Sequence, residues 1–238
     1  MGFLAELSEE NGVLSSGKSS DVSLIFVPGA FNTCIWKHQL SYFARGREVY
    51  SFTEEIESVE AQREEVKHLI ESSDSDFIIV THFLSFKAVE GLERRENVRK
   101  VVLSGNPGSE LRSYVFDSVL SLSLKHAKLA KTLLFHEATR YSVAKEFVES
   151  VELESDVGSW LSDFEIDDRV LRVQGDGGEG AVIERTAVFP FFEKPQEFNK
   201  VLSDLVLQIQ RLVKEQRIEA KQNRNKTLED FKLRRVEK

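Results

Sequence analysis

The sequence predicts an α/β fold in which a mostly parallel sheet carries helices on both faces. The chain has 238 residues, of which 41% are hydrophobic and 30% charged, enough for one large domain with a buried core. Its apolar runs are nearly continuous, as in DVSLIFVPG at 21–29, which is typical of strands buried on both faces. Segments with helical spacing of apolar residues alternate with these runs, and this alternation favours parallel strands joined by helices.

The N-terminal half supplies most of the alternation. Residues 3–14 predict a short hairpin, because the turn-forming pair Asn11-Gly12 lies between two short apolar segments. Asn32 and Ser58 are side chains that commonly precede the first turn of a helix. We expect strands at 21–29, 47–52, 76–83 and 98–106, and helices at 32–44, 58–72 and 85–95.

The C-terminal half begins with a segment in which strand-like runs are replaced by apolar residues at helical spacing. Residues 109–165 carry apolar residues at helical spacing and no strand-like run, which predicts an inserted helical lid. A strand at 169–175 and a short strand at 183–189 follow, and then a long helix that starts near Pro195. We therefore expect a domain over 1–213, with the lid at 109–165 inserted in it, and a basic helical tail over 214–238.

Composition excludes several classes of protein. Cys34 is the only cysteine, so no internal disulfide can form. The N-terminus has no basic segment followed by an apolar run, and no stretch approaches the roughly 20 apolar residues of a membrane span. We expect a cytoplasmic protein. No spacing of ligating side chains predicts a metal site, and GDGGEGA at 175–181 lacks the Lys-Ser/Thr ending of a phosphate-binding loop. We expect no cofactor.

Charge is distributed unevenly. Residues 211–238 hold ten basic and five acidic residues, a net charge of +5, whereas the other 210 hold 22 basic and 35 acidic residues, a net charge of −13. The tail is either a solvated helix or a contact element for an acidic surface, a nucleic-acid backbone or the acidic body of another copy. Nucleic-acid binding is not expected, because Phe231 is the only aromatic residue of the tail and the excess charge is small. The basic residues at one helical spacing are 211, 214, 217, 221 and 224.

Five stretches, in this order, resemble segments of the α/β-hydrolase superfamily over roughly residues 3–213. The first resembles the first core strand, the oxyanion loop and the helix and strand after it, and the second resembles the strand that leads into Gly-x-Ser-x-Gly. The others resemble the strand after the nucleophile helix, the strand and loop that deliver the catalytic acid, and the closing segment of the domain. They are IFVPGAFNTCIWKHQLSYFARGREVYSF, FIIVTHFLSF, ERRENVRKVVLSGNP, RVLRVQGDGGEG and AVFPFFEKPQEFNKVLSDLV.

The resemblance places the catalytic triad on side chains that cannot act as one. The nucleophile position falls on Phe83, the histidine position on Val188 and the acid position on Gly178, with Asp176 two residues earlier. Phenylalanine cannot attack a carbonyl group, and no histidine occurs after His136. A serine hydroxyl needs a base within hydrogen-bond reach to be a useful nucleophile. The chain thus resembles a pseudoenzyme with a degenerate catalytic triad.

The remaining site positions point to an apolar pocket. The resemblance assigns the oxyanion loop to Gly29, Ala30 and Phe31. The residues expected to converge at the pocket mouth are Phe31, Phe83, Leu84, Val188 and Phe189. Either these side chains fill the pocket or it holds a small apolar ligand. A different catalytic constellation would use Ser85, His82, Cys34 and Asp176, although His82 is expected to point away from the cleft and Ser85 into its own helix.

Three functional hypotheses follow. The leading one is a catalytically inactive α/β-hydrolase-like protein that serves as a binding or scaffold module for a small apolar ligand or a protein partner. The first alternative is an active serine or cysteine hydrolase, similar to esterases, with a noncanonical site. The second alternative is an adaptor that works through its basic C-terminal helix.

Overall fold

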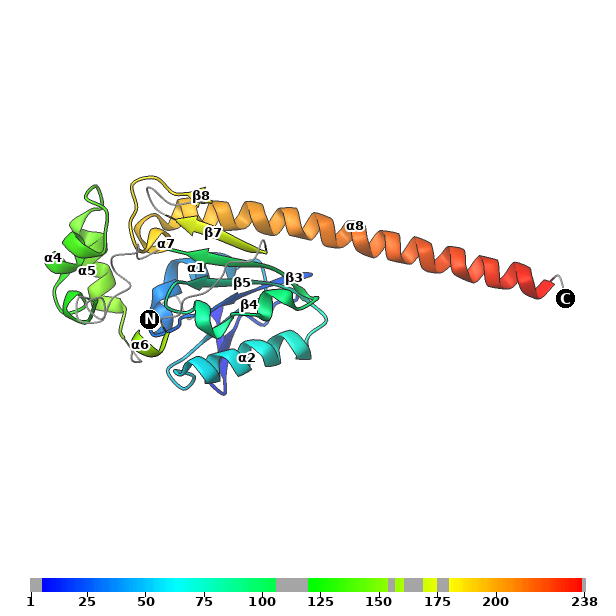
Figure 1. Cartoon of the computed structure of the whole chain (residues 1–238), viewed down its shortest axis with the longest axis horizontal. Helices are drawn as coiled ribbons and strands as arrows, with labels where there is room; N and C mark the ends of the chain where they lie inside the picture. Colours follow the sequence, from blue (N-terminus) through cyan, green and yellow to red (C-terminus); the bar gives the residue numbers. More distant parts are fainter. Residues whose placement is uncertain (1–5, 106–119, 154–156, 161–168, 175–179, 237–238) are drawn as a thin grey trace.

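An eight-stranded sheet forms the centre of the protein (Figure 1). The computed structural model describes residues 6–105, 120–153, 157–160, 169–174 and 180–236, with side chains to Asn223. The strand order is β1-β2-β4-β3-β5-β6-β7-β8; β1 and β2 join antiparallel, and all pairs from β4 to β8 are parallel. The prediction of a mostly parallel sheet is confirmed. The strands are Ser8–Glu10, Val13–Ser15, Val22–Phe26, Val49–Phe52, Asp76–His82, Val98–Ser104, Val170–Gln174 and Ala181–Val182.

The central strands β3 and β5 are buried along their whole length, as the continuous apolar runs predicted. Alternate residues face opposite sides of the sheet and enter two separate hydrophobic clusters. Phe26 and Val80 belong to one cluster, and Ile25 and Ile79 belong to the other. Each face of the sheet therefore needs a helical cover.

The helices provide that cover on both faces. Helices α1 (Lys37–Phe43) and α8 (Pro195–Val236) contribute buried residues to the first cluster, and α2 (Val59–Ser72) contributes to the second. Figure 1 shows α2 and α8 on opposite sides of the sheet. Ser58 accepts a hydrogen bond from the backbone N–H of Ala61 and so begins α2 as predicted.

Three local predictions are wrong. Residues 85–95 form no α-helix but two 3-10 turns, Phe86–Ala88 and Leu92–Arg94, because Gly91 between them has a left-handed φ of 82°. The strand expected at 183–189 is absent: β8 ends at Val182, and a φ of 58° at Arg185 then turns the chain. The helix expected from Asn32 begins as a 3-10 turn, Thr33–Trp36, and the Asn32 side chain does not cap it.

The segment between β6 and β7 is helical where the structure describes it. It contains α4 (Ala127–Leu133), α5 (Tyr141–Ser150) and α6 (Val157–Trp160). Phe135 and Phe147 from this segment pack with the same cluster as α1 and α8. The rest of the predicted lid, at 109–119, 154–156 and 161–165, lies outside the described residues.

Helix α8 is far longer than the sheet requires. It has 42 residues, a length of about 63 Å at 1.5 Å per residue. Its buried stripe comprises Phe198, Leu202, Val206, Ile209 and Val213, and beyond Val213 every described side chain is exposed. Figure 1 shows the helix continuing well past the sheet. Among the described residues, no helix combines the length and apolar character that a membrane crossing requires.

Candidate functional site

The turn after β5 places Phe83 at the carboxyl end of a central strand, where folds of this kind carry their reactive residue. The turn is closed by Ser85, whose Oγ lies 2.5 Å from Oγ1 of Thr81 and accepts a hydrogen bond from the N–H of His82 at 2.9 Å. The Ser85 hydroxyl is therefore occupied in holding the backbone of its own turn.

Gly29 allows the neighbouring loop to approach this turn. Its φ is 68°, and a Cβ atom at this position would lie 2.6 Å from the carbonyl oxygen of Leu84 and 2.6 Å from Cβ of Ser85. Both distances are shorter than real carbon contacts, so only glycine fits here. The loop and the turn are thus fixed against each other by backbone packing.

His82 is buried, and both nitrogens of its ring are engaged. Nε2 lies 2.8 Å from the carbonyl oxygen of Pro28, and Nδ1 accepts the backbone N–H of Leu84 at 3.2 Å. A carbonyl oxygen can only accept, so Nε2 carries the proton and Nδ1 carries the lone pair. Burial lowers the pKa of His82 to about 4, and the bond to Pro28 opposes this only in part. The imidazole is held as one neutral tautomer.

The ring of His82 packs among aromatic side chains of the site, contrary to the expectation that it points away from the cleft. Its centroid lies 5.4 Å from that of Phe31 and 5.9 Å from that of Phe83. It is also 5.7 Å from Trp36 and 6.1 Å from Phe191. A polar ring in this surrounding has no route to solvent and functions as part of the packing.

Phe83 and Val188 both lie close to Gly105, which follows the carboxyl end of β6. A Cβ atom on Gly105 would lie 2.2 Å from the carbonyl oxygen of Val188 and 3.6 Å from Cδ1 of Phe83. Phe189 packs against Phe83 and Phe31, with centroid distances of 6.0 Å in both pairs. The positions assigned to the nucleophile and the histidine therefore lie together, and both carry apolar side chains. Phe31, Phe83, Leu84, Val188 and Phe189 are all buried.

Three backbone N–H groups of the expected oxyanion loop and of the turn after β5 already have hydrogen-bond partners within the protein. Gly29 donates to Oε1 of Gln62 at 3.1 Å, and its carbonyl oxygen accepts from Nε2 of the same side chain at 3.0 Å. Phe31 donates to the carbonyl oxygen of Pro28 at 3.3 Å. Leu84, the residue after the nucleophile position, donates to His82. An oxyanion hole requires such donors to be directed at the substrate; Ala30, the remaining loop residue, is buried.

The described members of the alternative constellation do not form a catalytic pair. The Ser85 hydroxyl contacts Thr81 and the backbone of His82, whereas the His82 ring contacts Pro28 and Leu84. Cys34 lies in the 3-10 turn Thr33–Trp36 and is partly exposed, not buried as a structural cysteine would be. Asp176 and Gly178 lie outside the described residues.

Sequence reasoning missed two polar residues that organise the site. Gln62, from α2, binds both backbone groups of Gly29. Glu193, in α7 (Pro190–Glu193), accepts hydrogen bonds from the N–H of His136 at 2.9 Å, the hydroxyl of Thr139 at 2.5 Å and the N–H of Ala187 at 2.6 Å. Burial raises the pKa of Glu193. Glu193 opens the Glu-x-Pro-x-x-Phe pattern of the closing segment, but the pattern alone gives no indication of what the carboxylate binds.

Several solved structures share this architecture. An α/β-hydrolase family protein from Desulfitobacterium hafniense aligns with a TM-score of 0.58 at 12% identity, over 82% of this chain and 99% of that one. A serine hydrolase involved in carbazole degradation gives 0.56 at 16% identity, over 82% and 94%. A thermophilic esterase gives 0.55 at 18% identity, over 85% and 97%. The chain therefore has the α/β-hydrolase fold, and similarity at this level shows the fold alone.

No protein-family model and no curated protein sequence matches the chain. Within the part of the chain that the structure describes, no group of three His, Cys, Asp or Glu side chains is arranged to hold a metal ion.

Proposed function

We propose that this protein is a catalytically inactive member of the α/β-hydrolase fold that serves as a binding or scaffold module. The observation that carries the proposal is the arrangement of the turn after β5. Phe83 occupies the nucleophile position, and the adjacent backbone donor, Leu84 N–H, is bonded to Nδ1 of His82. The turn thus offers neither an attacking atom nor this donor for a developing negative charge.

Acyl transfer in this fold requires a nucleophile, a base beside it and oriented donors for the oxyanion. The base position holds Val188, and the one imidazole at the turn already uses both of its nitrogens within the protein. Taking up a proton would oblige His82 to break its bond with Leu84 in a buried, aromatic surrounding. Burial also disfavours the charged ring and lowers the pKa of His82 to about 4.

The apolar character of the former site supports a protein partner over an apolar ligand. Phe31, Phe83 and Phe189 pack against one another in the interior, and their side chains are at most 4% exposed. A ligand at this position would have to displace well-packed rings, which is costly in a close-packed core. Binding is therefore expected at the outer surface of the domain.

The proposal is tested with the purified full chain, a fluorophosphonate probe and a series of nitrophenyl acyl esters of increasing chain length. We expect no labelling and no turnover above that of heat-denatured protein. Phe83→Ser should also remain unlabelled, because the new hydroxyl would lack both a base and the Leu84 donor. Labelling of the wild type that disappears in Ser85→Ala or Cys34→Ala would overturn the proposal and favour a noncanonical hydrolase.

A further inference from the structure

The surface around α2 is strongly acidic. Residues 53–75 contain eight acidic residues and two basic ones, a net charge of −6 over 23 positions. Glu60, Glu64 and Glu71 are exposed and follow one another at helical steps of four and seven residues, so they share one face of α2. Two of them form ion pairs with exposed partners: Glu64 with Lys67 at 3.4 Å and Glu71 with Arg95 at 3.1 Å.

The projecting part of α8, residues 214–236, has the opposite charge. Lys214, Ile218 and Lys221 lie at steps of four and three residues, so a half-exposed apolar side chain is flanked by two lysines on one face. On α2, the exposed residues Glu64, His68 and Glu71 repeat these steps, with a carboxylate at each end. In both triplets the charged residues are two helical turns apart, about 10.5 Å. The two faces match in spacing and in charge.

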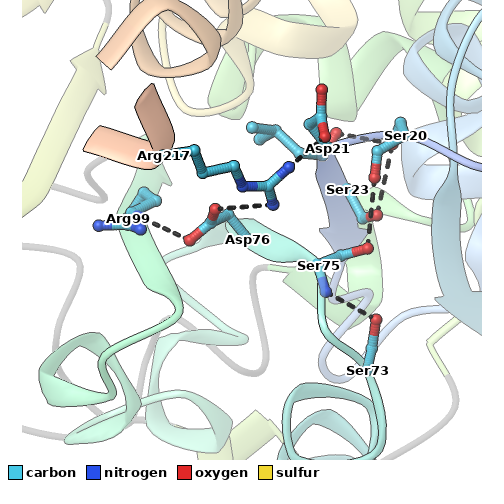
Figure 2. Close-up of polar contacts among 9 residues, drawn as sticks. Ser20, Asp21, Ser23, Ser73, Ser75, Asp76, Arg99 and Arg217 are labelled. Carbon is cyan, nitrogen blue, oxygen red and sulfur yellow. Dashed lines mark hydrogen bonds and ion pairs between the residues drawn. The ribbon is translucent and has the colours of Figure 1, made fainter. Parts of the chain in front are cut away.

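The projecting helix cannot reach the acidic face of its own chain. Arg217 forms an ion pair with Asp21, and its Nη2 atom lies 3.8 Å from Oδ2 of Asp76. Asp76 also forms an ion pair with Arg99 (Figure 2). These contacts hold α8 at the end of the sheet where strands β3 and β5 begin. Because α2 covers the opposite face of the sheet, the segment beyond Arg217 points away from it.

A solitary helix of this kind is poorly supported in water. Beyond Val213 the described residues of α8 add nothing to the core, and helices in proteins gain most of their stability from tertiary packing of one face. A second helix against the face of Lys214, Ile218 and Lys221 would supply both packing and neutralisation. The acidic face of α2 in another molecule has the charge and the spacing for this role.

We propose that residues 214–236 of α8 dock on the acidic face of α2 in a second copy of this chain. If both copies donate their helices, the contact closes on itself as a reciprocal pair with two identical interfaces. The inference does not depend on the absence of catalysis. Because most of the contacts are exposed ion pairs, the association is weak and sensitive to salt.

The experiment measures the mass of the full chain in solution by sedimentation over a dilution series. Association is expected at about 0.1 M salt and its loss at about 1 M, where the screening length falls from about 10 Å to about 3 Å. The tail variant Lys214→Glu/Lys221→Glu and the α2 variant Glu64→Lys/Glu71→Lys should each be monomeric. An equimolar mixture of the two should associate again, because the reversed tail fits the reversed α2 and the native tail fits the native α2.

Lys125→Glu/Lys128→Glu is the matched control, since it makes the same change in charge on exposed residues of the inserted helical segment. It should associate as the wild type does. A wild-type chain that is monomeric at every concentration in low salt would overturn the proposal. So would a mixture of the two charge-reversed variants that stays monomeric, or a control that loses association to the same extent as the tail variant.

Discussion

The backbone N–H of Leu84 donates to Nδ1 of His82, two residues earlier, at 3.2 Å. This local hydrogen bond engages two groups of the turn after β5, the backbone donor of Leu84 and the ring of His82. It uses the donor that hydrolases of this fold direct at the substrate, and it fixes the lone pair of the only histidine at the turn. The ring thereby becomes part of the wall of the site, alongside Phe31 and Phe83.

Replacement of His82 by alanine is expected to lower the free energy of unfolding by about 3 kcal/mol, because it leaves a cavity and removes the partners of two buried backbone groups. Those groups are the carbonyl oxygen of Pro28 and the N–H of Leu84. Urea unfolding followed by circular dichroism measures the loss. His68→Ala, at an exposed position on α2, is the control and should change stability by at most about 0.5 kcal/mol. Equal effects at the two positions would contradict a structural role for His82.

His82 also predicts how stability depends on pH. The folded-state pKa of about 4 lies below the ordinary pKa of 6.5 for histidine, so the unfolded chain binds a proton in this interval and the folded chain does not. Stability should therefore fall as the pH drops from 6.5 towards 4, by about 1.4 kcal/mol per pH unit from this group alone. Above 6.5 both states are neutral and the contribution vanishes.

The measurement compares urea unfolding of the wild type and His82→Gln at several pH values between 7 and 4.5, a range of about two units in which one histidine changes charge. The difference between the two proteins isolates His82 from His38, whose pKa is also lowered by burial. A difference that does not change with pH would mean that the folded protein binds the proton as readily as the unfolded chain.

Gly29→Ala is expected to lower the stability of the folded protein more than the same change at Gly17. Both glycines have a left-handed φ, of 68° and 63°, so both changes carry the backbone penalty of roughly 1–2 kcal/mol. At Gly17 nothing lies within 4 Å of the new Cβ, whereas at Gly29 it meets Leu84 and Ser85 at 2.6 Å. We expect an additional loss of about 1–3 kcal/mol at Gly29. Melting curves of the two variants should show the difference, and similar curves would mean that the loop can retreat from the turn.

Glu193 is expected to hold the inserted helical segment in place. Its carboxylate ties His136 and Thr139, between α4 and α5, to Ala187 in the closing segment. In Glu193→Ala, amide hydrogen exchange should increase over residues 127–150 while the strands β3, β5 and β6 keep their protection. Glu197→Ala is the control, since this exposed residue pairs only with Lys194 in the described contacts. Unchanged exchange over 127–150 would remove this role from Glu193.

Local chemistry in the sequence was sufficient to predict much of the fold. The Asn11-Gly12 turn has positive φ at both residues, 50° and 78°, and joins β1 to β2 as expected. Ser58 caps α2, and the continuous apolar runs became buried parallel strands. The helix expected at 85–95 did not form because Gly91 has a left-handed φ of 82°, although the apolar residues there are buried as the pattern predicted.

The site was less accessible to sequence reasoning because its decisive contacts join distant residues. The orientation of His82 depends on the carbonyl oxygen of Pro28, 54 positions away, and Gln62 reaches Gly29 across 33 positions. No local pattern encodes such pairings. The expectation that Phe83 and Val188 belong to one site came only from the resemblance to the hydrolase superfamily, which aligned two segments more than 100 residues apart.

The 42 residues of α8 give the molecule an asymmetric outline with a consequence for its motion. From Val213 to Val236 the helix extends for about 35 Å beyond its last buried residue, which is about twice the radius of gyration expected of a compact domain of this size. Such a rod slows rotation about two axes and leaves rotation about the third almost unaffected. It also sets the reach of the chain: a group attached near Val236 would lie about 35 Å along the helix from the last buried residue.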